Sequence, residues 1–142
     1  MRRGFSLIEI VAALGIMSVA VSLLLPAARD ASDRLSVVAA REDLVALIVR
    51  ARGEAIRHGG SSVFVRGRPA EAWIAAGGVV IERLDIRGRH RAELELSGAA
   101  QTVELRFDAT GLGRMAARSI TVHRGGAVVR LVISAYGRLR RE

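Results

Sequence analysis

The side chains that could carry out chemistry are few and scattered in this 142-residue sequence. It contains no cysteine, which excludes thiol catalysis, disulfides and cysteine-ligated metals. The histidines His58, His90 and His123 lie far apart, without the short spacing at which metal ligands often occur. Glu93 and Glu95 share one face of a predicted strand, as a catalytic pair would, but a solvated strand face has the same pattern. We therefore expect no enzyme, no catalytic residue, no metal site and no cofactor.

Arginine dominates the charge, because the formal net charge is +8 and lysine is absent. One basic cluster crowds a predicted turn and consists of Arg87, Arg89, His90 and Arg91. The other ends the chain after a glycine, in the order Gly137, Arg138, Leu139, Arg140 and Arg141. Arginines on a glycine turn could bind phosphates with salt-sensitive affinity, whereas a basic edge strand that blocks pairing with other sheets has the same composition. Trp73 and Tyr136 are the only aromatic residues with a polar group, which gives base stacking little support.

One carboxylate, Glu9, stands alone in an apolar stretch over residues 5–25. As a helix this stretch is long enough to span a bilayer. A charge inside the hydrocarbon costs a few kcal/mol on insertion scales. Neither a plain membrane anchor nor a cleaved secretory signal, with Arg2 and Arg3 as its basic region, accounts for it.

The stretch GFSLIE at residues 4–9 resembles the prepilin signal of type IV pilins and pseudopilins. The resemblance implies that a prepilin peptidase cleaves between Gly4 and Phe5, and that Phe5 becomes the N-methylated amino terminus. It also implies that Glu9 neutralises the amino terminus of a neighbouring subunit, so that its burial cost falls only in the assembled filament. Pro26 falls where many pilins bend this helix, since proline removes a backbone hydrogen bond.

The predicted secondary structure that positions these side chains changes from helix to short strands near residue 59. Apolar residues at spacings of three and four predict that the helix continues to residue 58, and this set is Val37, Ala40, Leu44, Leu47, Ala51 and Ala55. Gly59 and Gly60 then end the helix. Beyond them we expect six or seven short strands and a hairpin at Gly125 and Gly126, which indicate an antiparallel sheet or sandwich. The runs lie at 62–66, 72–75, 79–86, 92–97, 102–107, 119–123 and 127–134.

The predicted fold class is therefore α+β, with a long kinked N-terminal helix packed on an antiparallel β-sheet or sandwich head. Residues 1–4 form a leader peptide, and residues 5–25 form a transmembrane and filament-core helix. Residues 26–58 form its amphipathic continuation, and residues 59–142 form the antiparallel β head with a basic C-terminus. The helix and the head are expected to form one unit, because no linker separates them.

Three further stretches resemble the GspH/FimT group of minor pilin-like proteins, namely ARGEAIR at 51–57, FDATG at 107–111 and ISAYGRLR at 133–140. The resemblance implies a single-pass protein of the inner (cytoplasmic) membrane, with its head in the periplasm or outside. The implied partners are the prepilin peptidase, other major and minor pseudopilins and the inner membrane, with secreted cargo and DNA as further candidates.

Two functions remain open at this point. The first is a minor pseudopilin that serves as a structural subunit of a type II secretion pseudopilus. The second is a DNA-binding minor type IV pilin that acts in DNA uptake. It is implied by the resemblance to the FimT branch, in which a terminal Gly-Arg-x-Arg motif is implicated in binding DNA. Its candidate DNA-binding residues are Gly137, Arg138, Arg140 and Arg141.

Overall fold

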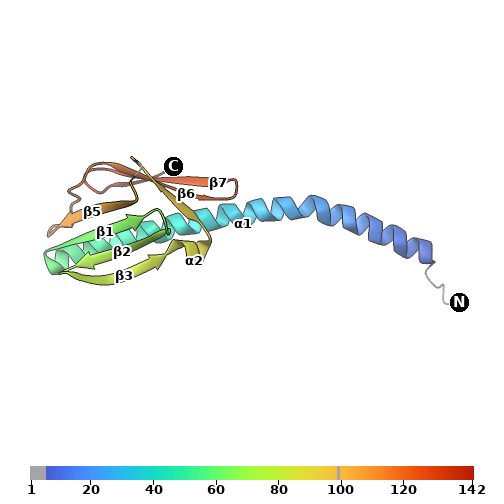
Figure 1. The fold of residues 1–142 in the computed structure, drawn as a ribbon, viewed down its shortest axis with the longest axis horizontal. Coiled ribbons are helices and arrows are strands. Elements are labelled where there is room, and N and C mark those ends of the chain that lie inside the picture. The colour runs from blue at the N-terminus through green and yellow to red at the C-terminus, as the bar shows by residue number, and fades with distance from the viewer. Residues whose placement is uncertain (1–5, 99) are drawn as a thin grey trace. The chain divides into compact units, whose positions relative to one another are not determined.

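The structure is a computed structural model that describes residues 6–98 and 100–142. Gly4 and Phe5, the predicted cleavage and methylation sites, lie outside the described residues. The chain divides into two compact units, residues 1–32 and residues 33–142, and one helix, α1 (Leu7–His58), belongs to both (Figure 1). The two units are described separately below, and the second is called the head.

In the first unit, α1 is apolar and its side chains are exposed. An 18-residue window of the helix has a mean hydropathy of 2.4, and none of that window is buried. By length and composition this helix could cross a membrane. Pro26 lies inside α1, which continues through it, and the predicted bend at Pro26 stays a prediction.

In the head, α1 becomes amphipathic. All six residues of the predicted apolar stripe are buried, and Val45 and Ile48 complete the stripe. Gly59 follows the helix with a φ of 76°, a left-handed conformation that favours glycine and ends helices. The predicted helix end is therefore confirmed.

Within residues 60–98 and 100–142, eight strands and one short helix follow α1, which is more than the six or seven strands that the sequence predicts. They are β1 (Gly60–Arg66), β2 (Glu71–Ala76), β3 (Val79–Asp85), α2 (Ile86–His90), β4 (Glu93–Leu96), β5 (Thr102–Asp108), β6 (Arg118–Arg124), β7 (Ala127–Ile133) and β8 (Leu139–Arg141). They form two four-stranded antiparallel sheets, with the strand orders β3-β2-β1-β5 and β4-β6-β7-β8. We call them the first and second sheet.

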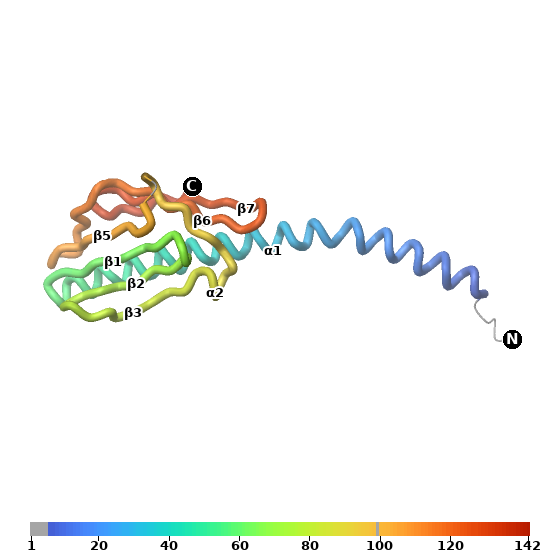
Figure 2. The backbone as a smooth tube through the Cα atoms, viewed as in Figure 1, coloured from blue at the N-terminus to red at the C-terminus, as the bar shows by residue number. Residues whose placement is uncertain are grey.

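The inward faces of both sheets and the stripe of α1 form one apolar core. Buried and partly exposed residues alternate along β1, β2 and β5, as a sheet with one covered face requires. In the head, β1 and β2 run alongside α1 (Figure 2). The hydroxyl of Ser61 on β1 donates to the carbonyl of Ala51 at 2.7 Å, and Arg50 on α1 pairs with Glu82 on β3 at 3.0 Å.

One local expectation was wrong. Ile86 was expected to end a strand and Arg87 to His90 to form a turn, but these residues form the helix α2. Asp85 caps this helix, because its carboxylate accepts a hydrogen bond from the Gly88 backbone N–H at 2.7 Å. Ile86 is buried and anchors α2 on the core.

Candidate functional site

The first candidate site is Glu9, in the first turn of α1. Its backbone N–H donates to the carbonyl of Ser6 at 3.0 Å, and its side chain is exposed. The adjacent Leu7 and Ile8 are 80% and 77% exposed. A carboxylate in the first turn also interacts favourably with the helix dipole. That effect would occur in any helix and does not explain why the carboxylate lies in an apolar segment.

The second candidate site is the basic C-terminal segment, which forms the edge strand β8. Leu131 lies opposite Arg141, Val132 opposite Arg140 and Ile133 opposite Leu139. Since side chains alternate along a strand, Leu139 and Arg141 share one face and Arg140 lies on the other. Strand alternation therefore divides the arginines that the sequence presents as one cluster.

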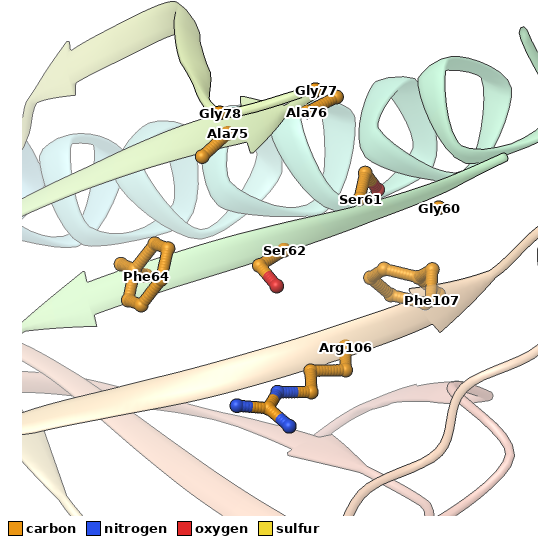
Figure 3. A pocket seen from close by; sticks show the side chains of 10 residues that line it. All are labelled: Gly60, Ser61, Ser62, Phe64, Ala75, Ala76, Gly77, Gly78, Arg106 and Phe107. Carbon is orange, nitrogen blue, oxygen red and sulfur yellow. The ribbon is translucent and has the colours of Figure 1, made fainter. Parts of the chain in front are cut away.

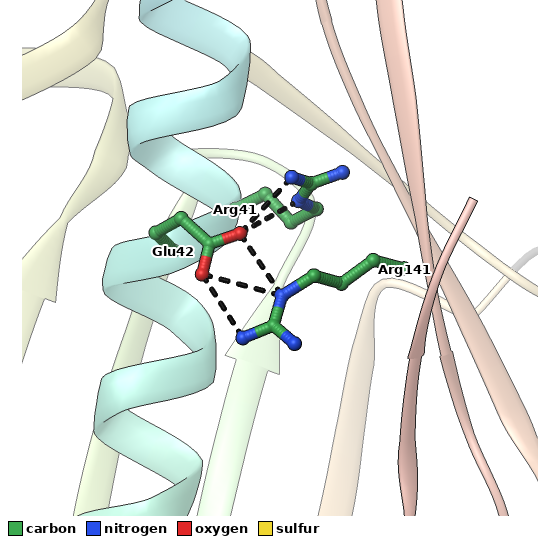
Figure 4. Close-up of polar contacts among 3 residues, drawn as sticks. All are labelled: Arg41, Glu42 and Arg141. Carbon is green, nitrogen blue, oxygen red and sulfur yellow. Dashed lines mark hydrogen bonds and ion pairs between the residues drawn. The ribbon is translucent and has the colours of Figure 1, made fainter.

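Arg141 faces α1 and binds Glu42 (Figure 4). Its Nε lies 3.1 Å and 3.3 Å from the two carboxylate oxygens, and its Nη2 lies 3.1 Å from Oε2. Arg41 contacts the same carboxylate at 3.0 Å. The hydrogen bond from Arg141 lowers the pKa of Glu42 below its ordinary value, and the neighbouring Arg41 adds to this effect.

Arg138 and Arg140 are exposed, and within residues 6–98 and 100–142 neither forms an ion pair. Arg130 on β7 lies on the same face as Arg140, because Arg140 is opposite Val132, two residues along. Arg130 is exposed as well. The outward face of the second sheet thus carries the exposed Arg130 and Arg140, and the exposed Arg138 directly precedes β8 at this edge.

Gly137 forms the turn that leads into β8. Its φ is 79°, it is buried, and a Cβ at this position would lie 2.7 Å from a nitrogen of Arg52 and 3.0 Å from the Phe107 ring. The Gly137 N–H donates to the carbonyl of Ser134 at 2.8 Å. Both the backbone conformation and the packing therefore require glycine here.

Arg52 holds this turn from α1, a role that sequence reasoning missed. Its Nη2 donates to the Gly137 carbonyl, and its Cζ lies 5.6 Å from the centroid of the Phe107 ring. Arg52 follows Ile48 by four residues and precedes Ala55 by three, so it lies on the apolar face of the helix. An arginine on the apolar face of a helix needs a polar partner inside the protein. This position could therefore have indicated the role of Arg52 from the sequence alone.

The other candidates do not converge. His58 pairs with Glu54, His90 with Asp43 and His123 with Glu93, at 3.3, 2.9 and 3.3 Å. In the described part of the chain, no three histidine or carboxylate side chains gather as a metal site would require. Glu95 is exposed on the same face of β4 as Glu93.

The basic cluster at residues 87–91 is partly paired. Arg89 lies 3.1 Å and His90 lies 2.9 Å from the same carboxylate oxygen of Asp43 on α1. Arg87 and Arg91 are exposed. This cluster therefore holds α2 against α1, and half of it remains solvated.

Residues 40–137 match the protein family described as type II transport protein GspH. The matched segment is well over half of the chain. The chain belongs to the GspH family. This match begins after Glu9 and ends at Gly137, so neither Glu9 nor the last arginines fall within it.

Among solved structures, the type IV minor pilin FimU of Pseudomonas aeruginosa is similar to this GspH-family protein. The identity is 22%, the TM-score is 0.56, and the match covers 73% of this chain and 90% of FimU. At that identity the likeness shows the fold, which confirms the prediction of a long apolar helix with antiparallel β-sheets. Comparison with curated proteins gives no match.

Family membership makes this chain a pilin-like structural protein and not an enzyme. A GspH-family minor pilin or pseudopilin assembles with other pilins. The long N-terminal apolar helix is consistent with membrane anchoring of the kind that pilins use.

Proposed function

We propose that this protein is a minor pseudopilin, a structural subunit of a type II secretion pseudopilus that takes part in protein secretion. Before assembly, residues 5–25 anchor it in the inner membrane by a single pass, with the head in the periplasm. A prepilin peptidase cleaves between Gly4 and Phe5, and Phe5 is N-methylated. Other major and minor pseudopilins are its partners in the filament, and secreted cargo is a further candidate.

The observation that carries this proposal is the lone carboxylate of Glu9 on an exposed apolar helix, in a chain whose head belongs to the GspH family. In lipid this carboxylate is costly. A neighbouring subunit's amino terminus at Phe5 would supply the opposite charge, so that burial of both groups is favourable only in the filament. Glu9 would thereby link withdrawal from the membrane to assembly.

The test replaces Glu9 by alanine in cells that build the pseudopilus. We expect Glu9→Ala subunits to remain membrane-bound and processed but to be depleted at least about tenfold from purified filaments, since the amino terminus then lacks its counter-charge. Asp30→Ala is the matched control, because it removes a carboxylate from the same helix outside the apolar stretch. Normal recovery of Glu9→Ala subunits in filaments would refute the assembly role.

A second candidate function is DNA binding by a minor pilin that serves DNA uptake. The observation that favours it is the exposure of Arg138, just before β8, and of Arg140 and Arg130 on one face of the second sheet. Guanidinium groups bind phosphates well, and an unpaired group needs no prior release from a carboxylate. Arg141 does not meet this condition, because Glu42 already binds it.

This candidate is tested by titrating the full chain in detergent micelles with duplex DNA at two salt concentrations. DNA uptake predicts micromolar binding that weakens with salt and falls at least about tenfold in Arg138→Ala/Arg140→Ala. Arg87→Ala/Arg91→Ala is the control that removes two exposed charges elsewhere. Absence of binding at low salt, or equal losses in both double variants, would exclude a DNA site on β8.

A further inference from the structure

The second sheet has two edge strands, β4 and β8, at the ends of its strand order. The Ser97 N–H donates to the Ser119 carbonyl at 3.0 Å, in register with the pairing of β4 and β6. Because the direction of bonding alternates along an antiparallel strand, the backbone groups of Leu94 and Leu96 point away from β6. In the described residues, no other strand pairs with this edge of β4.

The edge of β8 is free in the same way. The backbones of Arg130 and Glu142 exchange two hydrogen bonds, at 2.8 and 2.9 Å, in register with the pairing of β7 and β8. The same alternation directs the backbone groups of Leu139 and Arg141 away from β7. Each edge therefore presents two residues, two positions apart, whose backbone groups an added antiparallel strand could bind.

A groove of about 810 Å³ lies beside β4, and all four residues of the strand line it, together with Gly67 and Arg68 of the turn between β1 and β2. A Cβ on Gly67 would lie 3.2 Å from the carbonyl oxygen of Leu94 and 3.9 Å from Cγ of Leu96, whose side chain belongs to the core. Gly67 therefore approaches β4 from the core side, and its lack of a side chain leaves the edge accessible.

The outward face of the first sheet also has a hollow, but a smaller one. Its volume is about 340 Å³, and small side chains such as Ser62 line it beside Phe64 and Arg106 (Figure 3). Glu104 already binds Arg106, at 2.8 and 3.0 Å. Because its arginine is paired within the chain, this hollow selects no partner by charge.

The edge strands of the second sheet carry unlike charges on the outward face. On β4, Glu95 is exposed, and Glu93 lies 3.3 Å from His123 with 60% of its side chain exposed. On β8, Arg140 is exposed on the same face, opposite Val132 of β7. Glu95 and Arg140 form no ion pair in the described part of the chain. Each of them can therefore meet a charge that a partner supplies.

The strand order decides how the edges of two copies can meet. The strands of the second sheet alternate in direction, so β4 and β8 run antiparallel to each other within one head. A second head that adds its β4 to β8 in antiparallel fashion therefore has the same orientation as the first. One β4 and one β8 remain free at the ends, so that the contact can repeat.

One antiparallel register joins both free residues of each edge. Leu96 then lies opposite Leu139 on the core side of the sheet. Glu95 lies opposite Arg140 on the outward side, and opposite charges stabilise a strand pair. The same register would oppose Glu95 to Glu95 between two β4 strands, and Arg140 to Arg140 between two β8 strands. The charges thus select the pairing of β4 with β8 over the pairing of like edges.

Two carboxylates, Glu93 and Glu142, also come opposite each other in this register. Each has a favourable neighbour on its other side, because His123 contacts Glu93 at 3.3 Å and Arg130 lies opposite Glu142 within the sheet. These neighbours reduce the repulsion between the two carboxylates. Glu95 and Arg140 therefore remain the pair that decides the contact.

We propose that β8 of one head pairs with β4 of a second copy of this chain in this register, and that Glu95 and Arg140 form an ion pair across the contact. The charges of these short edge strands disfavour like pairs and favour this combination. The contact belongs to the heads, so it holds whether or not Glu9 acts in filament assembly. It gives Arg140 a carboxylate partner at a defined position, which distinguishes it from the DNA-binding candidate.

The first test uses disulfide linkage, because the chain has no cysteine. Full chains with Glu95→Cys and full chains with Arg140→Cys are mixed in detergent micelles and treated with a mild oxidant. Opposite residues at a non-hydrogen-bonded position have Cα atoms about 4.5 Å apart, which a disulfide can span.

We expect this mixed dimer to form at least about tenfold faster than the dimer of Glu95→Cys with Arg130→Cys. Arg130→Cys is the matched control, because Arg130 is exposed on the same face one strand further from the edge. Equal rates for the two mixtures, or faster linkage of Glu95→Cys to itself, would overturn the proposal.

The second test exchanges the two charges in the chain without cysteine and measures self-association by energy transfer between labelled copies. Glu95→Arg and Arg140→Glu should each weaken self-association at least about fivefold, since each opposes like charges. A mixture of the two variants should restore it, because every contact between them joins opposite charges. Arg87→Glu, at an exposed position on α2, is the control and should leave it unchanged. Failure of the mixture to recover, or an equal loss in Arg87→Glu, would overturn pairing through β4 and β8.

Discussion

The two parts of α1 carry the same kinds of apolar residue with opposite exposure. Leu7 and Leu23 in the first unit are 80% and 72% exposed, whereas Leu44 and Leu47 in the head are fully buried. Each buried leucine contributes roughly 1.5–3 kcal/mol relative to an exposed one. The head therefore fills its own core, while the first unit leaves its apolar surface for lipid or for other subunits to cover.

The two parts of α1 therefore depend on different properties of their side chains. In the head, side-chain shape matters, because each buried residue is surrounded by neighbours of the same chain. In the first unit, apolar composition matters more than side-chain shape, because no residue of the described chain covers these side chains. Substitutions of the same type should thus have different effects in the two units.

The largest expected effect comes from truncating a leucine in each unit. Leu44→Ala should lower the free energy of unfolding of the head by about 2–5 kcal/mol, because it leaves a cavity in the core. Leu14→Ala, in the exposed part of α1, should change it by less than about 0.5 kcal/mol. Urea unfolding of the full chain in detergent, followed by Trp73 emission, measures both. Similar losses would mean that the first unit belongs to the cooperative core.

A smaller effect is expected from adding one methyl group at the turn before β8. Gly137→Ala should destabilise the head by about 1–3 kcal/mol, since it strains a left-handed backbone and displaces Arg52. Gly126→Ala is the control, because a Cβ there meets nothing within 4 Å and its φ lies outside the left-handed region. The same urea titration compares them, and an unchanged midpoint for Gly137→Ala would show that Arg52 does not hold this turn.

Sequence reasoning succeeded where a pattern is local. The apolar stripe of α1, the glycine stop after His58 and the hairpin at Gly125 and Gly126 are examples. In each of them, consecutive members of the pattern are separated by only a few residues. It missed α2, because five residues are too few to show helical periodicity and they follow a β-rich run. Short elements of this kind are decided by a cap such as Asp85 and by burial of one side chain.

The candidate sites illustrate the same limit. Arg52 and Gly137 are 85 residues apart, and Glu42 and Arg141 are 99 residues apart. Contacts between residues this far apart produce no periodic pattern that can be recognised in a single sequence. The sequence therefore presents Gly137, Arg138, Arg140 and Arg141 as one basic motif, whereas the register of β8 places Arg141 against α1 and leaves Arg138 and Arg140 in solvent.

The smallest expected effect concerns the bond between α1 and β8. Glu42→Gln should lower the stability of the head by about 0.5–1 kcal/mol at pH 7 and low salt, because the pair with Arg141 is partly exposed. The folded-state pKa of Glu42 lies below the ordinary 4.5, so its contribution is present above that pH and is lost as the pH falls through the folded value.

The stability difference between the wild type and Glu42→Gln should therefore be constant from pH 7 to about pH 5 and vanish at lower pH, with salt reducing it throughout. Urea midpoints measured over this range test the prediction. Glu95→Gln is the control, since that exposed carboxylate on β4 forms no ion pair in the described part of the chain. A difference that persisted unchanged at low pH would show that Glu42 holds β8 by packing, and that charge has no part in fixing this edge of the head.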